Sequence, residues 1–128
     1  MGRRLLIDTD VLIDYLRNRP ESVQFVEALE TRAVLSVITV AELYAGVRDG
    51  KERAELESFV QRSVLIDLDE QICTAAGLLL RQYRKSHGMG LADALIAATV
   101  QSQNASLASL NVKHFPMLKD VIVPYTKS

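Results

Sequence analysis

Short apolar runs, separated by stretches long enough for helices, are the feature that most constrains the fold of this sequence. Four runs lie at residues 5–7, 33–37, 64–66 and 106–110, and a weaker fifth lies at 121–123. Such runs are typical of strands that are buried on both faces. Strands that alternate with helices are joined by right-handed crossovers, which makes them parallel. We therefore predict an α/β fold, a three-layer α/β/α sandwich with a mostly parallel central sheet.

The segments between the runs carry helical periodicity and helix-end signals. We expect helices to begin near the following residues: Val11, Pro20, Thr39, Glu52, Asp69 and Leu91. Asp69 is a good N-cap for a long helix that ends near Ser86. We expect residues 87–90 to form a flexible connection and Cys73 to be a buried thiol.

Length and composition predict a single domain over residues 1–128. The chain is 48% hydrophobic and 24% charged, which is typical of a globular protein. Its 15 Lys and Arg against 16 Asp and Glu give a net charge of −1, so any nucleic acid must be held by local patches. A single cysteine excludes an internal disulfide and a cysteine-rich zinc site. No apolar run reaches the roughly 18 to 20 residues that cross a bilayer, and we expect a cytoplasmic protein without membrane contact.

Asp8 directly follows the first apolar run. A carboxylate that ends a buried strand is costly unless something pairs with it, although it could also form a turn or a helix cap. In parallel sheets, ligands collect at the carboxyl ends of the strands. Asp8 is therefore a candidate site residue, with its neighbours Thr9 and Asp10 as secondary candidates. Asp10 is the better candidate for the helix cap, or it could support a metal site.

Glu42 and Asp93 are two further candidates. Glu42 follows Thr39 by three residues and could complete a capping box, which is its structural alternative. Against this alternative, small residues at Ala45 and Gly46 leave space beside the carboxylate. Asp93 lies in the first turn of its helix, at the head of an apolar stripe, where a carboxylate needs a partner.

Three acids from three distant segments suit a hard divalent cation. Mg²⁺ and Mn²⁺ prefer oxygen ligands and keep several waters, so their ligands can come from separate loops. The sequence has neither a His and Cys spacing typical of zinc nor a glycine-rich phosphate loop. We therefore expect Asp8, Glu42 and Asp93 to bind Mg²⁺ or Mn²⁺ for attack on a phosphodiester.

Four segments together resemble PIN-domain proteins, and they span nearly the whole chain in the same order. They are Leu5–Ile13, Ser36–Leu43 followed by Gly46, Leu91–Ala98 and Leu107–Phe115. The short length resembles the VapC-like toxin branch of toxin–antitoxin pairs. The resemblance implies that Asp8, Glu42 and Asp93 are metal-binding catalytic acids of an RNA-cleaving enzyme. It also implies a homodimer and a co-expressed antitoxin that occupies the acidic groove.

The fourth segment departs from the family pattern. Ser109 fits the serine or threonine expected there, but Asn111 stands where many PIN domains have an aspartate. An amide oxygen carries no charge, which places a second, fully occupied metal site in doubt. Ser109 and Asn111 are therefore secondary site candidates, and Asn111 could also be a simple turn residue.

Substrate contacts are harder to assign from the sequence. Arg48, Arg84 and Lys85 belong to two basic clusters that could contact RNA phosphates, although charged helix faces often only face water. Two alternatives remain open at this point. The Asp8-Thr9-Asp10-Val11 motif also resembles haloacid-dehalogenase-type phosphatases, in which the first Asp is the nucleophile. The missing fourth acid would also suit an inactive PIN-like interaction module.

Overall fold

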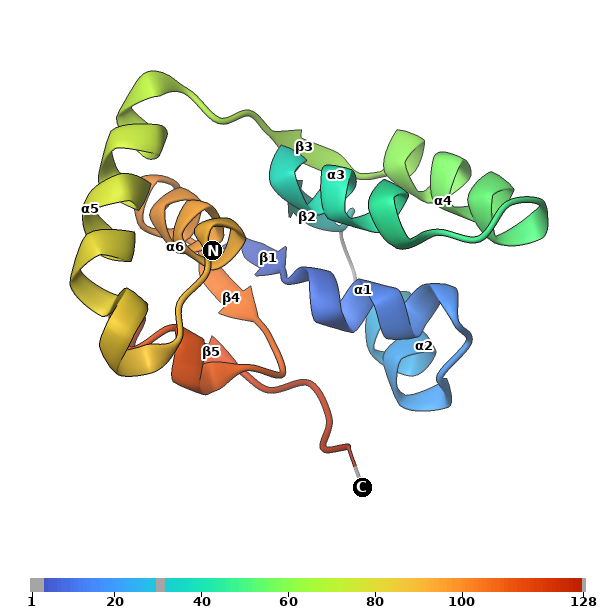
Figure 1. Ribbon diagram of the computed structural model, residues 1–128. Coiled ribbons are helices and arrows are strands. Elements are labelled where there is room, and N and C mark those ends of the chain that lie inside the picture. Colours follow the sequence, from blue (N-terminus) through green and yellow to red (C-terminus); the bar gives the residue numbers. More distant parts are fainter. Residues whose placement is uncertain (1–3, 30–31, 128) are drawn as a thin grey trace.

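The computed structural model describes residues 4–29 and 32–127 and confirms the predicted α/β class (Figure 1). The strands in these ranges form one sheet in the order β3-β2-β1-β4-β5, and all neighbouring pairs are parallel. Their bounds are β1 Leu5–Ile7, β2 Val34–Ser36, β3 Val64–Ile66, β4 Ser106–Ala108 and β5 Val121–Ile122.

Helices cover both faces of the sheet. Their bounds are α1 Thr9–Leu16, α2 Pro20–Glu27, α3 Val37–Gly46, α4 Lys51–Arg62, α5 Glu70–His87 and α6 Leu91–Ser102, with a short 3-10 helix, η1, at Val112–His114. Helices α5 and α6 lie on one side of the sheet, and α1 to α4 lie on the other (Figure 1). In the described part of the chain, no helix is both long and apolar enough to cross a membrane.

The alternation of side chains along each strand explains the two apolar clusters on opposite faces of the sheet. Leu6 and Val34 pack into the apolar cluster under α5 and α6. The next residue of each strand, Ile7 and Leu35, packs into the cluster under α1 to α4. Successive strand side chains point to opposite faces, and both faces are covered, so the strands read as continuous apolar runs.

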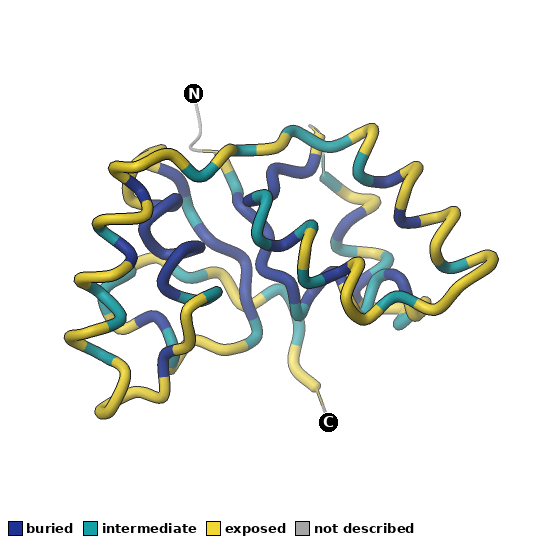
Figure 2. The backbone as a smooth tube through the Cα atoms, turned by 45° about the horizontal axis from the view of Figure 1, so that its top comes forward, coloured by how far each residue is buried: buried dark blue, intermediate teal, exposed yellow. Residues whose placement is uncertain are grey.

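Helix α6 is the most deeply buried helix. Every residue from 94 to 100 is buried, because the sheet covers one side of the helix and α5 covers the other (Figure 2). A helix that is apolar all round is typical of this sandwiched position. Asp93 stands at the start of this rigid helix, which therefore holds the aspartate backbone in place.

The pairing of β1 with β4 fixes the edge where the candidate site lies. Ile7 pairs with Ala108, and the Asp8 N–H donates to the Ala108 carbonyl at 2.9 Å. Asp8 and Ser109 therefore emerge side by side at the carboxyl ends of neighbouring strands, although they are a hundred residues apart in sequence.

Two predicted helix starts are wrong. Helix α1 begins at Thr9 with Asp8 as its N-cap, so the cap is Asp8 and not Asp10. Helix α3 begins at Val37, where the Ser36 hydroxyl accepts the Ile38 N–H at 3.2 Å. Each helix starts at the end of its strand, two residues earlier than predicted.

Two smaller predictions are also corrected. Cys73 is exposed on α5, because its helix buries the faces of Ile72 and Ala76 instead. The predicted flexible connection at 87–90 has Gly88 in the left-handed conformation, with φ of 63°, and buries Met89 in the core. The link between α5 and α6 is therefore a packed turn.

Candidate active site

Asp8 is the buried centre of the candidate site. Its side chain lies at the carboxyl end of β1 and the residue is 5% exposed. One carboxylate oxygen accepts the Thr9 backbone N–H at 2.8 Å, and the other accepts the Ser109 hydroxyl at 2.6 Å. Both oxygens are thus oriented by neutral donors, and each keeps a lone pair for a further ligand.

Burial raises the pKa of Asp8 to about 7, and the neighbouring Asp10 and Asp93 carboxylates add to this rise. The hydrogen bonds from Ser109 and Thr9 act in the opposite direction but do not offset it. Removal from water disfavours the charged form of a carboxyl group, and nearby negative charges disfavour it further. A bound cation would stabilise the charged form at this position.

Asp10 connects α1 to the segment after β4. Its Oδ1 accepts the Val11 N–H at 2.8 Å, and its Oδ2 accepts the Leu110 N–H at 3.1 Å. The Asn111 amide also donates to this Oδ2, at 3.2 Å. Burial raises the pKa of Asp10 as well. The structure thus places Asp10 and Asn111, both predicted as secondary site residues, in contact with each other beside Asp8.

Glu42 reaches the site through Thr9. The Thr9 hydroxyl donates to Glu42 Oε1 at 2.6 Å, and it also lies 3.1 Å from the hydroxyl of the buried Thr39. Because Ser36 caps α3, the predicted capping box between Thr39 and Glu42 is wrong. Glu42 therefore does not cap its helix, and its carboxylate contacts Thr9, the residue after Asp8.

Asp93 lies across the site from Glu42, at the start of α6. Its Oδ2 accepts the Gly90 N–H at 3.0 Å, so Asp93 does cap its own helix. The same oxygen lies 3.3 Å from Nδ1 of His114, and both side chains are about a quarter exposed. The Asp93 carboxylate also contributes to the raised pKa of Asp8.

The candidate acids offer carboxylate oxygens, the type of donor that Mg²⁺ and Mn²⁺ prefer. Among the described residues, no three His, Cys, Asp or Glu side chains form a group that could hold a metal ion by themselves. Glu42 contacts Thr9, and Asp93 contacts Gly90 and His114. Mg²⁺ commonly binds through one or two carboxylates, keeps waters and adds substrate phosphate oxygens. The donor set around Asp8 fits such an ion.

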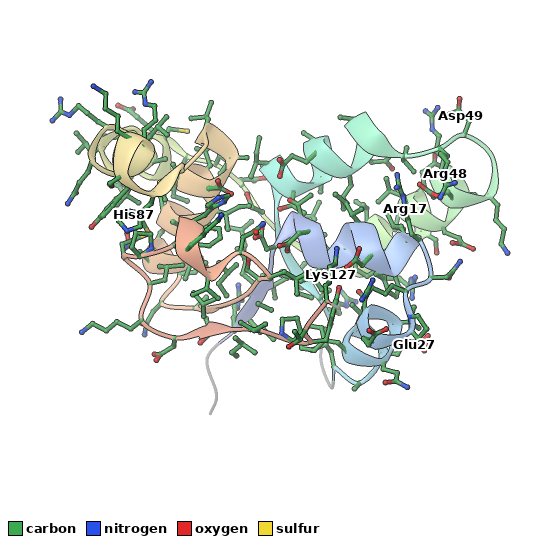
Figure 3. The ribbon with its side chains drawn as sticks, turned by 60° about the horizontal axis from the view of Figure 1, so that its bottom comes forward. Arg17, Glu27, Arg48, Asp49, His87 and Lys127 are labelled. Carbon is green, nitrogen blue, oxygen red and sulfur yellow. The ribbon has the colours of Figure 1, made fainter. Side chains whose placement is uncertain are left out.

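The predicted substrate-contacting cations do not gather in one place. Arg48 is exposed and pairs with Glu52 at 3.0 Å. Arg84 and Lys85 lie in the last turn of α5, next to His87. Figure 3 shows Arg48 and His87 at opposite ends of the molecule, so the two basic clusters belong to separate surfaces.

Comparison with known proteins identifies the family. The PIN domain family matches residues 5–116, which contain all three candidate acids. The chain belongs to the PIN-domain family. This membership favours the nuclease interpretation of Asp8 over the phosphatase alternative.

Several similar PIN-domain proteins carry ribonuclease names. The chain is 40% identical over 124 residues to Ribonuclease VapC19 of Mycobacterium tuberculosis, covering 94% of this chain and 98% of the relative. It is 34% identical to Ribonuclease VapC1 of Methanocaldococcus jannaschii, covering 91% and 82% of the two chains.

Solved structures agree with the PIN-domain fold. A toxin–antitoxin complex from Klebsiella pneumoniae contains a chain with a TM-score of 0.79 and 28% identity, covering 95% of this chain and 98% of that one. VapBC2 from Rickettsia felis, bound to a promoter DNA fragment, has a TM-score of 0.72 at 25% identity and covers 92% and 95%.

Sequence reasoning missed two side chains at this site of the PIN domain. His114 contacts Asp93, and Thr39 contacts Thr9. Both lie within the segments that resemble the family. The sequence therefore shows where these residues stand, but it does not show which side chains they contact. The contact of His114 depends on the turn of η1, and that of Thr39 on the early start of α3.

Proposed function

We propose that this PIN-domain protein is a metal-dependent endoribonuclease that acts as the toxin of a toxin–antitoxin pair. The similarity to VapC ribonucleases and to chains of VapBC complexes, over nearly the whole length of each, supports this assignment. The observation that carries the chemistry is Asp8, a buried carboxylate with its pKa raised to about 7 and other acids beside it.

Asp8, Glu42 and Asp93 are the residues that would hold Mg²⁺ or Mn²⁺ at the carboxyl edge of the sheet. When bound, such an ion polarises the phosphodiester and lowers the pKa of an attacking water. The chain's own contribution is orientation: Ser109 holds the Asp8 carboxylate, and Thr9 holds that of Glu42. Hydrogen-bonded ligands of this kind keep the geometry of a metal site fixed.

Asp10 and Asn111 have a supporting role in this proposal. The Asp10 oxygens accept three hydrogen bonds, which join α1 to the loop after β4. Asn111 donates its amide N–H to Asp10, and as a neutral amide it adds no charge to the edge. We infer one strong metal position, formed around Asp8, with Asn111 outside its ligand set.

The proposed partners follow from the same relatives. The chain acts on RNA and is bound by a cognate antitoxin, as the solved VapBC and toxin–antitoxin complexes suggest. A homodimer and a cytoplasmic location remain predictions from the family resemblance. Light scattering coupled to size-exclusion chromatography would test the dimer directly.

Cleavage of total cellular RNA tests the proposed function. We expect the purified wild type to cut RNA with Mg²⁺ or Mn²⁺ and to be inactive with chelator. Asp93→Asn should be inactive under all conditions, while Glu57→Gln, an exposed substitution on α4, should behave like the wild type. If the folded wild type leaves RNA intact with both metals, the inactive interaction module becomes the better interpretation.

A further inference from the structure

The segment after β5 lines a cavity beside the acidic site. The family match ends at residue 116, whereas residues 123–127 leave the sheet at the carboxyl edge, next to Asp10. A cavity of about 380 Å³ lies between Asp10 and Asn111 at the acidic edge and Thr126 and Lys127 of this segment. Its volume falls in the range of ligand-binding pockets.

Contacts with α1 and the following turn fix the path of this segment. The Tyr125 hydroxyl donates to Asp14 Oδ2 at 2.7 Å, and the Arg19 guanidinium lies 5.8 Å from the centre of the Tyr125 ring. Burial and the hydrogen bond to Asp14 raise the pKa of Tyr125 to about 12, so its hydroxyl keeps its proton at neutral pH. Lys127, two residues later, is thus held beside α1 (Figure 3).

The ammonium group of Lys127 has capacity for a further partner. Its Nζ lies 3.0 Å from Asp14 Oδ2, the oxygen that also accepts the Tyr125 hydroxyl, and the Lys127 side chain is 48% exposed. An ammonium group has three donors, and a half-exposed ion pair contributes little stability. Lys127 can therefore bind an incoming anion without a large loss of protein stability.

A polyanionic substrate needs such a cation near this edge. The net charge of the chain is −1, and Asp8, Asp10 and Asp93 make the edge itself acidic. The clusters of Arg48 and of Arg84 and Lys85 lie at opposite ends of the molecule, and none of these three residues lines this cavity. Lys127 instead lines the same cavity as Asp10 and Asn111.

We propose that this cavity binds a phosphate of the RNA strand adjacent to the cleaved bond, with Lys127 as its cationic contact. Thr126 and Asn111 line the same cavity, and hydroxyl and amide groups suit the phosphate and sugar oxygens of a nucleotide. This inference rests on the proposed ribonuclease function and adds a substrate-positioning residue to it.

Steady-state cleavage of one RNA substrate, measured over a range of salt concentrations, tests the proposal. Lys127→Gln should raise KM roughly 3- to 10-fold and leave kcat nearly unchanged, because the lost contact is to a phosphate and not to the reacting atoms. The slope of log(kcat/KM) against log[salt] should become less negative by about 0.7, which is the value for one phosphate contact of a single strand. Lys127→Arg should restore both quantities.

Lys119→Gln is the matched control. Lys119 is exposed and lines a different cavity, beside the first residue of β4 at the opposite edge of the sheet, so its removal should change neither KM nor the salt dependence. Equal melting temperatures would show that all variants fold. If Lys127→Gln matches the wild type in KM and salt dependence, the cavity does not bind RNA and the inference is wrong. If the wild type itself does not cleave RNA, the proposed function fails first, and the two failures are distinguishable.

Discussion

Carboxylates in two regions of this protein have opposite surroundings. The acids of α4 are exposed or partly exposed, and each pairs with a basic residue four positions earlier: Arg48 with Glu52, Lys51 with Glu55 and Arg53 with Glu57. The Arg48 backbone N–H donates to Glu52 and lowers the pKa of its carboxyl group. Asp8, in contrast, is buried, forms no ion pair with a described residue and has a raised pKa.

The contrast separates acids that the chain neutralises itself from one that it leaves without a counter-charge. Surface pairs at helical spacing support a helix weakly and need nothing further. A buried carboxylate among other carboxylates destabilises the fold unless a cation binds there. The chain therefore keeps Asp8 at a cost to stability, as expected for a functional site.

The largest difference between the two regions should appear in catalysis. Asp8→Asn should reduce RNA cleavage by about 100-fold or more, because the metal would lose its most buried ligand. Glu52→Gln should leave the rate unchanged, because Glu52 only pairs with Arg48. Cleavage of a labelled oligoribonucleotide in Mg²⁺ measures the rates of both variants. Equal rates would show that Asp8 is no more important for catalysis than Glu52.

Asp8→Asn should increase the stability of the metal-free protein, although it reduces the activity. Without metal, Asp8→Asn should stabilise the protein by about 1–3 kcal/mol at pH 7.5, because a buried charge is replaced by a neutral amide of similar shape. Urea unfolding with chelator present measures this change, and Glu57→Gln, at an exposed position of α4, serves as the unchanged control. A loss of stability in Asp8→Asn would mean that the Asp8 carboxylate is structural.

The pH dependence sharpens the same comparison. The pKa of Asp8 is about 7 in the folded protein and 3.8 as the ordinary value, so between these pH values the folded state binds more protons than the unfolded state. The contribution of Asp8 to the metal-free stability should therefore be most favourable below about pH 4 and fall by roughly 1–2 kcal/mol between pH 5 and 7. Asp10, whose pKa is also raised, acts in the same direction.

Urea unfolding at several pH values, with chelator, follows this decline. In Asp8→Asn the slope should be shallower, and in the wild type added Mg²⁺ should reduce it, because the cation favours the charged carboxylate. A wild type whose metal-free stability rises from pH 5 to 7 would contradict the assignment.

Ser109→Ala tests the hydrogen bond that orients Asp8. The Ser109 hydroxyl lies 2.6 Å from Asp8 Oδ2, so its loss should leave this oxygen without a donor from the chain and weaken Mn²⁺ binding by about 10-fold. Calorimetric titration measures the affinity. Ser106→Ala, at the other end of the same strand, is the control, and an equal effect of both variants would show that the loss is merely structural.

The order of strands and helices was predictable because short apolar runs fit a sheet that is covered on both faces. The exact helix starts were not: Ser36 and Asp8 end strands and cap helices at once, a double role that periodicity does not reveal. The exposure of Cys73 depends on which face of α5 contacts α6, and its apolar neighbours in sequence gave no indication of that.

The site was predictable as residue types and only partly as geometry. Asp8 could be placed at the sheet edge because it ends a strand. The contact between Ser109 and Asp8 depends on the pairing of β1 with β4, and sequence alone gave these residues no shared partner. The position of Lys127 depends on how Tyr125 meets Asp14 across 111 residues, which no local pattern encodes.

We infer that the acids at the sheet edge bind a divalent metal and that the ion-paired acids of α4 do not. Titration of Mn²⁺ by calorimetry into the wild type, Asp8→Asn, Asp93→Asn and Glu52→Gln tests it most directly. We predict that the wild type and Glu52→Gln bind one ion with equal affinity and that the two Asp variants lose this binding. Equal Mn²⁺ binding by all four proteins, or none by the wild type, would contradict the claim.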